Sequence, residues 1–124
     1  MILVSYSNIL KGFMTDLHNE SCIPCKGGIP PFDISEIHKY LKKVDGWDVK
    51  KKETETYFLE KNFTFKNFLE SQEFVNRVGE IAEKEGHHPD IIFGWGYARV
   101  QIFTHKIKGL VVSDFILAAK IDKI

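Results

Sequence analysis

The sequence predicts an α+β fold, in which a four-stranded antiparallel sheet carries helices packed on one face. Segments with helical and strand periodicity alternate in the order helix, strand, strand, helix, strand, strand, helix. A short turn joins the two strands of each pair, which is typical of hairpin neighbours and of an antiparallel sheet. The 124 residues are enough for one domain with one core.

The first helix is predicted after a loop at residues 18–32, which holds cysteine, glycine and proline. Asp33 can cap this helix, with Glu36 three residues further on as in a capping box. Apolar side chains then recur at helical spacing, at Ile34, Ile37, Leu41 and Val44. Asp45-Gly46 is expected to end the helix after about three turns, because Gly46 suits the left-handed position beyond a helix.

A hairpin and a long helix are predicted next. Residues 47–50 and 57–63 have the pattern of strands joined by a charged turn, and the second strand has large apolar side chains on both faces. Thr64 can cap the helix that follows. Gly86 is expected to end this helix, and Pro89 prevents its continuation.

The last part of the chain predicts a second hairpin and a final helix. Residues 91–93 and 99–104 have the pattern of strands, separated by Gly94-Trp95-Gly96. The final helix is expected over about residues 113–123, where most side chains are apolar.

Composition and the N-terminus argue against several classes of protein. Seventeen Lys and Arg balance seventeen Asp and Glu, so no basic nucleic-acid-binding face is indicated. No apolar run approaches the ~20 residues of a membrane-spanning helix. The first thirty residues contain no Arg, and no basic segment precedes the apolar start, so we expect a cytoplasmic protein without a secretory signal or transit peptide. Ten Phe predict a packed core, an oligomer interface, or both.

Cys22 and Cys25 form a CxxC motif. Such a pair is compatible with a disulfide, half a zinc site or a redox centre. A redox CxxC usually opens a helix, whereas Pro24 lies inside this motif and glycine and proline follow it. We interpret the pair as two free thiols in a surface loop, with the zinc and redox roles left open.

Three histidines are the candidate catalytic residues. His87 and His88 lie together at the end of the predicted long helix, and His105 lies at the end of a predicted strand. Imidazole has a reference pKa of about 6.5, so it can give or take a proton near neutral pH. Zinc can use three histidines, but adjacent histidines are an uncommon ligand spacing. A polar helix cap and a surface residue remain the third interpretation.

The residues around these histidines resemble the pterin-4a-carbinolamine dehydratases. The resemblance covers about residues 20–124 as one domain, and residues 1–19 are interpreted as an N-terminal extension of unknown role. The loop at residues 22–31 and Gly46-Trp47 are also similar to the family. The most specific matches, at the family's spacing, are His87-His88-Pro89, Thr104-His105, Gly109-Leu110 and Asp114.

The resemblance implies an activity and a set of partners. The activity is dehydration of 4a-hydroxytetrahydropterin, such as 4a-hydroxytetrahydrobiopterin, to quinonoid dihydropterin, with no metal or cofactor. This step recycles the pterin used by aromatic amino-acid hydroxylases. The implied fold is a four-stranded antiparallel sheet with helices on one face, assembled as a homodimer or homotetramer. No direct nucleic-acid or membrane partner is expected.

The resemblance also implies roles for single residues. Loss of water requires a proton delivered to the hydroxyl on C4a and a proton removed from N5. His87 and His105 are the implied acid–base pair, with the order of roles left open, and His88 binds and polarises the pterin. Asp114 is expected to orient one histidine. The residues expected to contact the substrate, beyond the three histidines, are Glu83, Trp47, Pro89, Thr104 and Asp114.

Some features depart from the family pattern or leave other functions open. Val111 stands where members commonly have Ser or Thr, so Ser113 is expected to cap the last helix and shift its start. Trp95 is a further candidate wall for the flat ring of the pterin. Two rival functions are a coactivator-type dimerisation partner, or other non-catalytic interaction module, and a three-histidine metal hydrolase.

Overall fold

The computed structural model describes residues 16–22 and 29–124. The described chain has a short 3-10 helix, three α-helices and four strands, in the order that the sequence predicts. The elements are η1 (Asp16–Asn19), α2 (Ile34–Leu41), β1 (Asp48–Lys51), β2 (Tyr57–Thr64), α3 (Phe68–Glu85), β3 (Asp90–Gly94), β4 (Tyr97–Ile102) and α4 (Val112–Ile121).

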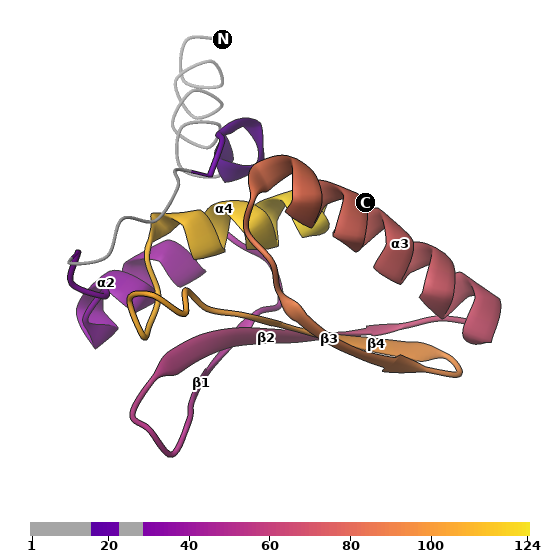
Figure 1. Ribbon diagram of the computed structural model, residues 1–124, viewed down its shortest axis with the longest axis horizontal. Coiled ribbons are helices and arrows are strands. Elements are labelled where there is room, and N and C mark those ends of the chain that lie inside the picture. Colours follow the sequence, from indigo (N-terminus) through magenta and orange to yellow (C-terminus); the bar gives the residue numbers. More distant parts are fainter. Residues whose placement is uncertain (1–15, 23–28) are drawn as a thin grey trace, which may run out of the picture.

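The four strands form one antiparallel sheet in the order β1-β2-β4-β3. Figure 1 shows the α-helices above one face of this sheet, whereas no helix of the described residues covers the opposite face. The predicted α+β fold is therefore confirmed. The two central strands come from different hairpins, and their pairing joins the two halves of the chain.

The core lies between the sheet and the helices. Leu59 and Ile102 are direct partners across β2 and β4, and both are fully buried. From above, α4 contributes side chains along nearly its whole length, including Phe115 and Leu117 at 0% exposure. Burying one such side chain stabilises the fold by about 1.5–3 kcal/mol. Because α4 is buried on almost every side, its polar residue Asp114 is also removed from water.

The first α-helix is shorter than predicted. Asp33 caps it as expected, and its Oδ1 accepts a hydrogen bond of 2.9 Å from the backbone N–H of Glu36. The helix then ends at Leu41 rather than at Gly46. Gly46 does adopt a left-handed backbone, with φ of 76°, but within the loop before β1. The chain leaves the helix early and brings Trp47 into the core.

The predicted cap at Thr64 is wrong. Thr64 is the last residue of β2, where it pairs with Tyr97 of β4. The cap of α3 is Asn67, whose Oδ1 accepts a hydrogen bond of 2.9 Å from the backbone N–H of Glu70. At the other end, Gly86 has φ of 64° and ends α3 in the left-handed conformation, as predicted.

The last strand and last helix also differ from the prediction. The strand ends at Ile102, and Thr104 instead forms an isolated bridge with Gly109. The helix begins at Val112, so Ser113 does not shift its start. Val111 has no side-chain oxygen to cap this helix, but Asp114 supplies the other half of a capping box, because its Oδ2 accepts a hydrogen bond of 2.8 Å from the backbone N–H of Val111.

Cys22 is a free thiol, half-buried rather than on the surface. Its Sγ lies 3.5 Å from the carbonyl oxygen of Ser113, and its backbone N–H donates to Glu85. Burial, reinforced by the negative charge of Glu85, raises the pKa of the Cys22 thiol to about 12. Such a thiol is a poor nucleophile at neutral pH. Cys25 lies outside the described residues.

Part of the described N-terminal segment contributes to the core. Leu17 of η1 is 7% exposed and joins the core, and Lys120 of α4 donates a hydrogen bond to the carbonyl oxygen of His18. The core therefore includes a residue from the segment interpreted as an extension.

Within the described ranges, no helix has the length and apolar character needed to cross a bilayer.

Candidate active site

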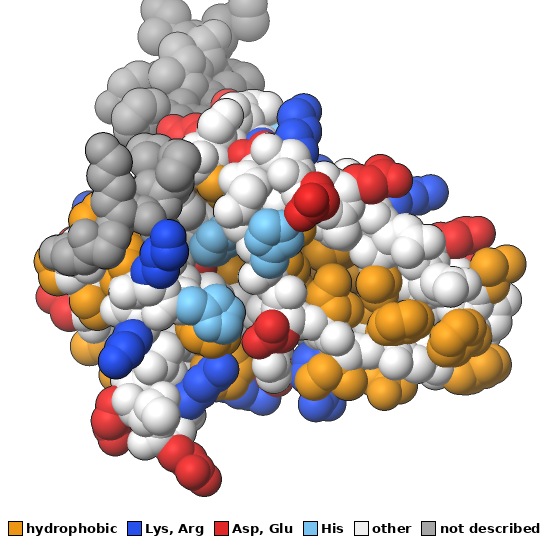
Figure 2. All heavy atoms as spheres, in the orientation of Figure 1, with side chains coloured by type: hydrophobic (Ala, Val, Ile, Leu, Met, Phe, Trp, Pro, Cys, Tyr) orange, Lys and Arg blue, Asp and Glu red, His pale blue; other side chains and the backbone are white. Residues whose placement is uncertain are grey.

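A cavity of about 450 Å³ lies where the end of α3, the start of β3 and the turn after β4 meet. His87, His88 and His105 all line it, together with Pro89 and Thr104. Figure 2 shows histidine side chains grouped on this face of the molecule. The structure therefore brings together three histidines that the sequence places in two separate segments.

The end of α3 fixes His87 in place. The backbone N–H of His87 reaches back to the carbonyl oxygen of Ala82, and the N–H of Gly86 bonds to Glu83. This pattern is typical of a helix closed by a left-handed glycine. Pro89 then favours an extended backbone at His88 and leads the chain directly into β3.

A buried carboxylate holds the imidazole of His87. The Nε2 atom lies 2.7 Å from Oδ1 of Asp114, and the His87 side chain is 12% exposed while that of Asp114 is 0% exposed. Thr104 lies on the other side of Asp114, with Oγ1 at 3.0 and 2.9 Å from its two carboxylate oxygens. Together with the N–H of Val111, these groups surround a carboxylate that water does not reach.

This arrangement selects one tautomer of neutral His87. A carboxylate can only accept hydrogen bonds, so the imidazole must donate through Nε2. The Nδ1 atom then carries the lone pair and is the ring nitrogen that can face the cavity. Asp114 would also stabilise the imidazolium that forms when Nδ1 takes up a proton. The geometry thus suits His87 to accept a proton from a bound molecule.

His88 and His105 are held more loosely. The Nε2 atom of His88 lies 2.5 Å from Oε2 of Glu83, but the two side chains are 62% and 79% exposed. A pair so open to solvent orients a side chain only weakly. The exposed His105 ring lies 4.2 Å, between centroids, from the ring of Phe103. In the described part of the chain, no group of three or more His, Cys, Asp or Glu could hold a metal ion.

The comparisons with known proteins cover the part of the chain that holds this cavity. A family model described as Pterin 4 alpha carbinolamine dehydratase matches residues 30–124, which include every residue of the cavity. The chain belongs to this family. Its members are named for a hydro-lyase activity on a pterin carbinolamine.

Curated relatives in the dehydratase family are similar over most of their length. A relative from Rubrobacter xylanophilus, named as a pterin-4-alpha-carbinolamine dehydratase, is 48% identical over 111 residues, which are 90% of this chain and 100% of the relative. A relative of the same name from Methylococcus capsulatus is 50% identical over 105 residues, which are 85% of this chain and 90% of the relative.

Two solved structures share the dehydratase fold. One is described as a transcriptional coactivator/pterin dehydratase from Brucella melitensis, with a TM-score of 0.66, 27% identity, and coverage of 75% of this chain and 96% of that chain. The other is a pterin dehydratase-like protein described as a RuBisCO assembly factor in the alpha-carboxysome. Its TM-score is 0.53 and its identity 23%, over 63% of this chain and 87% of that chain, so it shows the fold alone.

The predicted site residues of this dehydratase-family chain do not all line the cavity. Asp114 lies behind His87 and is fully buried. Thr104 does line the cavity, but it is 4% exposed and directs its hydroxyl to Asp114. Sequence analysis did not single out Phe103, which lines the cavity. Its position two residues before His105 could have indicated it, because alternate side chains of an extended segment share one side.

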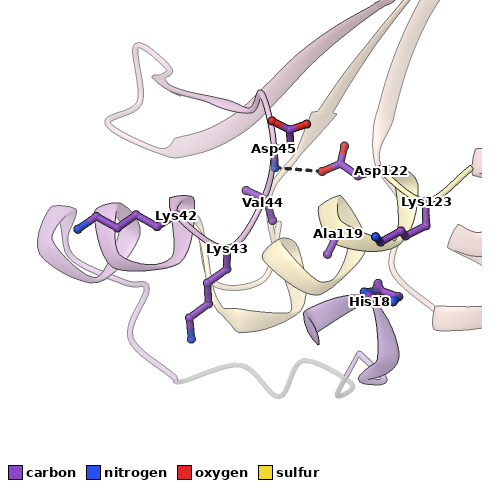
Figure 3. A pocket seen from close by; sticks show the side chains of 8 residues that line it. All are labelled: His18, Lys42, Lys43, Val44, Asp45, Ala119, Asp122 and Lys123. Carbon is purple, nitrogen blue, oxygen red and sulfur yellow. Dashed lines mark hydrogen bonds between the residues drawn. The ribbon is translucent and has the colours of Figure 1, made fainter. Parts of the chain in front are cut away.

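Trp47 is outside this cavity. This residue is 6% exposed, and its Nε1 donates to both carboxylate oxygens of Asp122 at 3.0 Å. The ammonium of Lys61 bonds to the same carboxylate at 2.8 Å, and the backbone N–H of Asp45 at 3.2 Å. Figure 3 shows the contact of Asp45 with Asp122, beside a second cavity of about 370 Å³ that contains none of the three candidate histidines. The Trp47 indole thus anchors the end of α4.

We expect Asp122→Ala to lower the free energy of unfolding by about 2–3 kcal/mol, because the buried indole N–H and the half-buried ammonium both lose their acceptor. Asp45→Ala is the control, since Asp45 enters this network through its backbone N–H and C=O. That variant should stay within about 0.5 kcal/mol of the wild type. Urea unfolding measures both, and equal effects in the two variants would contradict the anchoring role.

Proposed function

We propose that this chain dehydrates 4a-hydroxytetrahydropterin to quinonoid dihydropterin and water by histidine acid–base catalysis. The observation that carries the proposal is the buried contact of His87 with Asp114 beside a cavity shared with His105. The contact with Asp114 leaves Nδ1 of His87 free to act as a base. His105 provides a second imidazole from the turn after β4. Family membership supports the substrate class.

In the proposed reaction, His87 acts as the base and His105 as the acid. Nδ1 of His87 removes the proton from N5 of the pterin, and the Asp114 carboxylate stabilises the resulting imidazolium. Imidazolium His105 delivers a proton to the C4a hydroxyl, the C–O bond breaks, and water leaves as the C4a–N5 double bond forms. The exposed His105 then regains a proton from solvent, and His87 releases the proton that it took from N5 to solvent. Each positioned transfer accelerates the reaction by about 10²–10⁴-fold.

The remaining roles belong to the same proposal. His88 and Pro89 lie beside each other in the cavity lining, where they would contact the ring of the pterin. The hydroxyl on C4a is what an oxygen-transferring hydroxylase would leave on its pterin, and it must be lost as water before the pterin can be reduced again. We therefore propose that the protein recycles the pterin of aromatic amino-acid hydroxylases.

Dehydration of 4a-hydroxytetrahydropterin, followed by absorbance, tests the proposed function. The assay is run with and without a metal chelator, and the slow reaction without protein is subtracted. We expect the same acceleration in both conditions. A rate equal to the background would contradict the proposed function, and activity lost in chelator but restored by zinc would contradict catalysis by the histidines without a metal.

We also propose that the chain assembles as a homodimer or homotetramer. Large apolar side chains stay exposed on α3 and around the β3–β4 hairpin, and Phe68 and Phe93 contact each other there. The exposed members are Phe68, Leu69, Ile92, Phe93, Trp95 and Tyr97. Apolar clusters of this kind are typical of interfaces between proteins. A sedimentation mass near 14 kDa at micromolar concentration would contradict the assembly.

A further inference from the structure

Charge is divided across the mouth of the candidate active site. Figure 2 shows Lys or Arg side chains on one side of the histidine group and Asp or Glu side chains on the other. Among the cavity residues, Lys106 and Asp90 represent the two signs. Glu83 adds a second acidic group through its contact with His88. The cavity therefore presents different chemistry to the two ends of a bound molecule.

A second lysine reaches the basic side from the β1–β2 hairpin. The ammonium of Lys52 lies 3.8 Å from the ring centroid of Phe103, which lines the cavity. The backbone of Lys52 is fixed on both sides, because its N–H donates to Thr56 at 2.8 Å and its carbonyl accepts from Glu55 at 2.9 Å. Lys52 thus contacts a ring that lines the cavity but does not line the cavity itself.

Among the residues that the structure describes, Lys52 and Lys106 have no carboxylate partner. Their neighbours Lys50 and Lys51 are paired with Glu60 and Glu55. Throughout residues 16–22 and 29–124, neither Lys52 nor Lys106 forms an ion pair. Residues 1–15 and 23–28 contain no Asp or Glu, so they cannot supply a side-chain carboxylate. Two positive charges without a carboxylate partner, Lys106 in the cavity lining and Lys52 on the ring of Phe103, therefore remain available to a ligand.

We propose that the pterin bound here has an anionic group, a phosphate or a carboxylate, on its C6 side chain. This inference rests on the proposed function for the pterin itself. The 2-amino group and N3–H of a pterin are hydrogen-bond donors at one end of the bicycle, which suits the acidic side of the cavity. The C6 side chain leaves from the opposite end, toward Lys106 and Lys52. A neutral side chain would leave both charges unused.

Equilibrium binding tests the inference without requiring turnover. Quenching of protein fluorescence is measured with three dihydropterins, whose C6 side chains are neutral, phosphorylated or glutamylated. We expect at least one anionic compound to bind about fivefold or more tightly than the neutral compound at low salt, with the difference falling as salt screens the charges. The preference should disappear in Lys52→Gln/Lys106→Gln.

Lys51→Gln is the matched control, because it removes the same charge from the same hairpin at a residue paired with Glu55. This variant should keep the preference for the anionic compound. Equal binding of all three compounds to the wild type would overturn the inference, and so would a preference that survives in the double variant. A retained preference without dehydration would instead sustain the anionic ligand and contradict the proposed function.

Discussion

Asp114→Asn is expected to lower kcat by about 10²–10⁴-fold while KM changes little, because the change reverses the tautomer of His87. In the wild type, the carboxylate accepts from both His87 and the backbone N–H of Val111. An Asn side chain has one oxygen and one NH₂ group. The Val111 N–H can only donate, so the amide oxygen of the Asn side chain must face it and accept its hydrogen bond. The NH₂ group then faces His87. His87 must then accept through Nε2 and carry its proton on Nδ1, where it cannot act as a base.

Thr104 provides the graded variants for the same test. Thr104→Val keeps the shape but removes the hydroxyl that contacts both oxygens of Asp114, and we expect kcat to fall about tenfold. Thr104→Ser keeps the hydroxyl and should stay close to the wild type. Steady-state kinetics measures all three variants, and nitrogen chemical shifts of the His87 ring report the tautomer. A wild-type kcat in a folded Asp114→Asn variant would contradict the role of Asp114.

The fold could be predicted from the sequence because its elements carry local patterns. Asp33 with Glu36, and Gly86 before Pro89, each indicate a helix end within a few residues, and the structure has both ends there. Thr64 failed as a cap because its pairing with Tyr97 extends β2, and that pairing joins residues 33 positions apart. Asn67 caps α3 instead, and only the pairing of β2 with β4 excludes Thr64 from that role.

The site was predicted less completely than the fold. The three histidines stand in short motifs with recognisable spacing, and the structure places all three around one cavity. The burial of Asp114 depends instead on α4 being covered on almost every side, which no local pattern indicates. Trp47 shows the same limit, because its partner Asp122 lies 75 residues further along the chain. The pair Gly46-Trp47 looks the same in the sequence whether the tryptophan packs in the core or lines a pocket, so the sequence alone does not distinguish the two roles.

His105→Ala is expected to lower kcat by about 10²-fold or more, because it removes the acid that protonates the leaving hydroxyl. The backbone N–H of Thr104 bonds to the carbonyl of Gly109 at 2.9 Å, and this closed turn carries His105 opposite His87. Combined with His87→Ala, the loss should be much smaller than the product of the two single losses, because groups that act as a unit are not additive. The uncatalysed reaction must be subtracted, since it compresses large losses.

His88→Ala is the comparison that distinguishes the roles of the histidines. Its side chain is 62% exposed and its partner Glu83 even more so, which leaves it poorly fixed for proton transfer but able to contact the ring of a bound pterin. We therefore expect His88→Ala to raise KM more than it lowers kcat. Single-turnover and steady-state rates at pH 7 separate the two effects. If His105→Ala kept the wild-type kcat while His88→Ala abolished it, His88 would be the acid, and the turn at residues 104–109 would only shape the cavity.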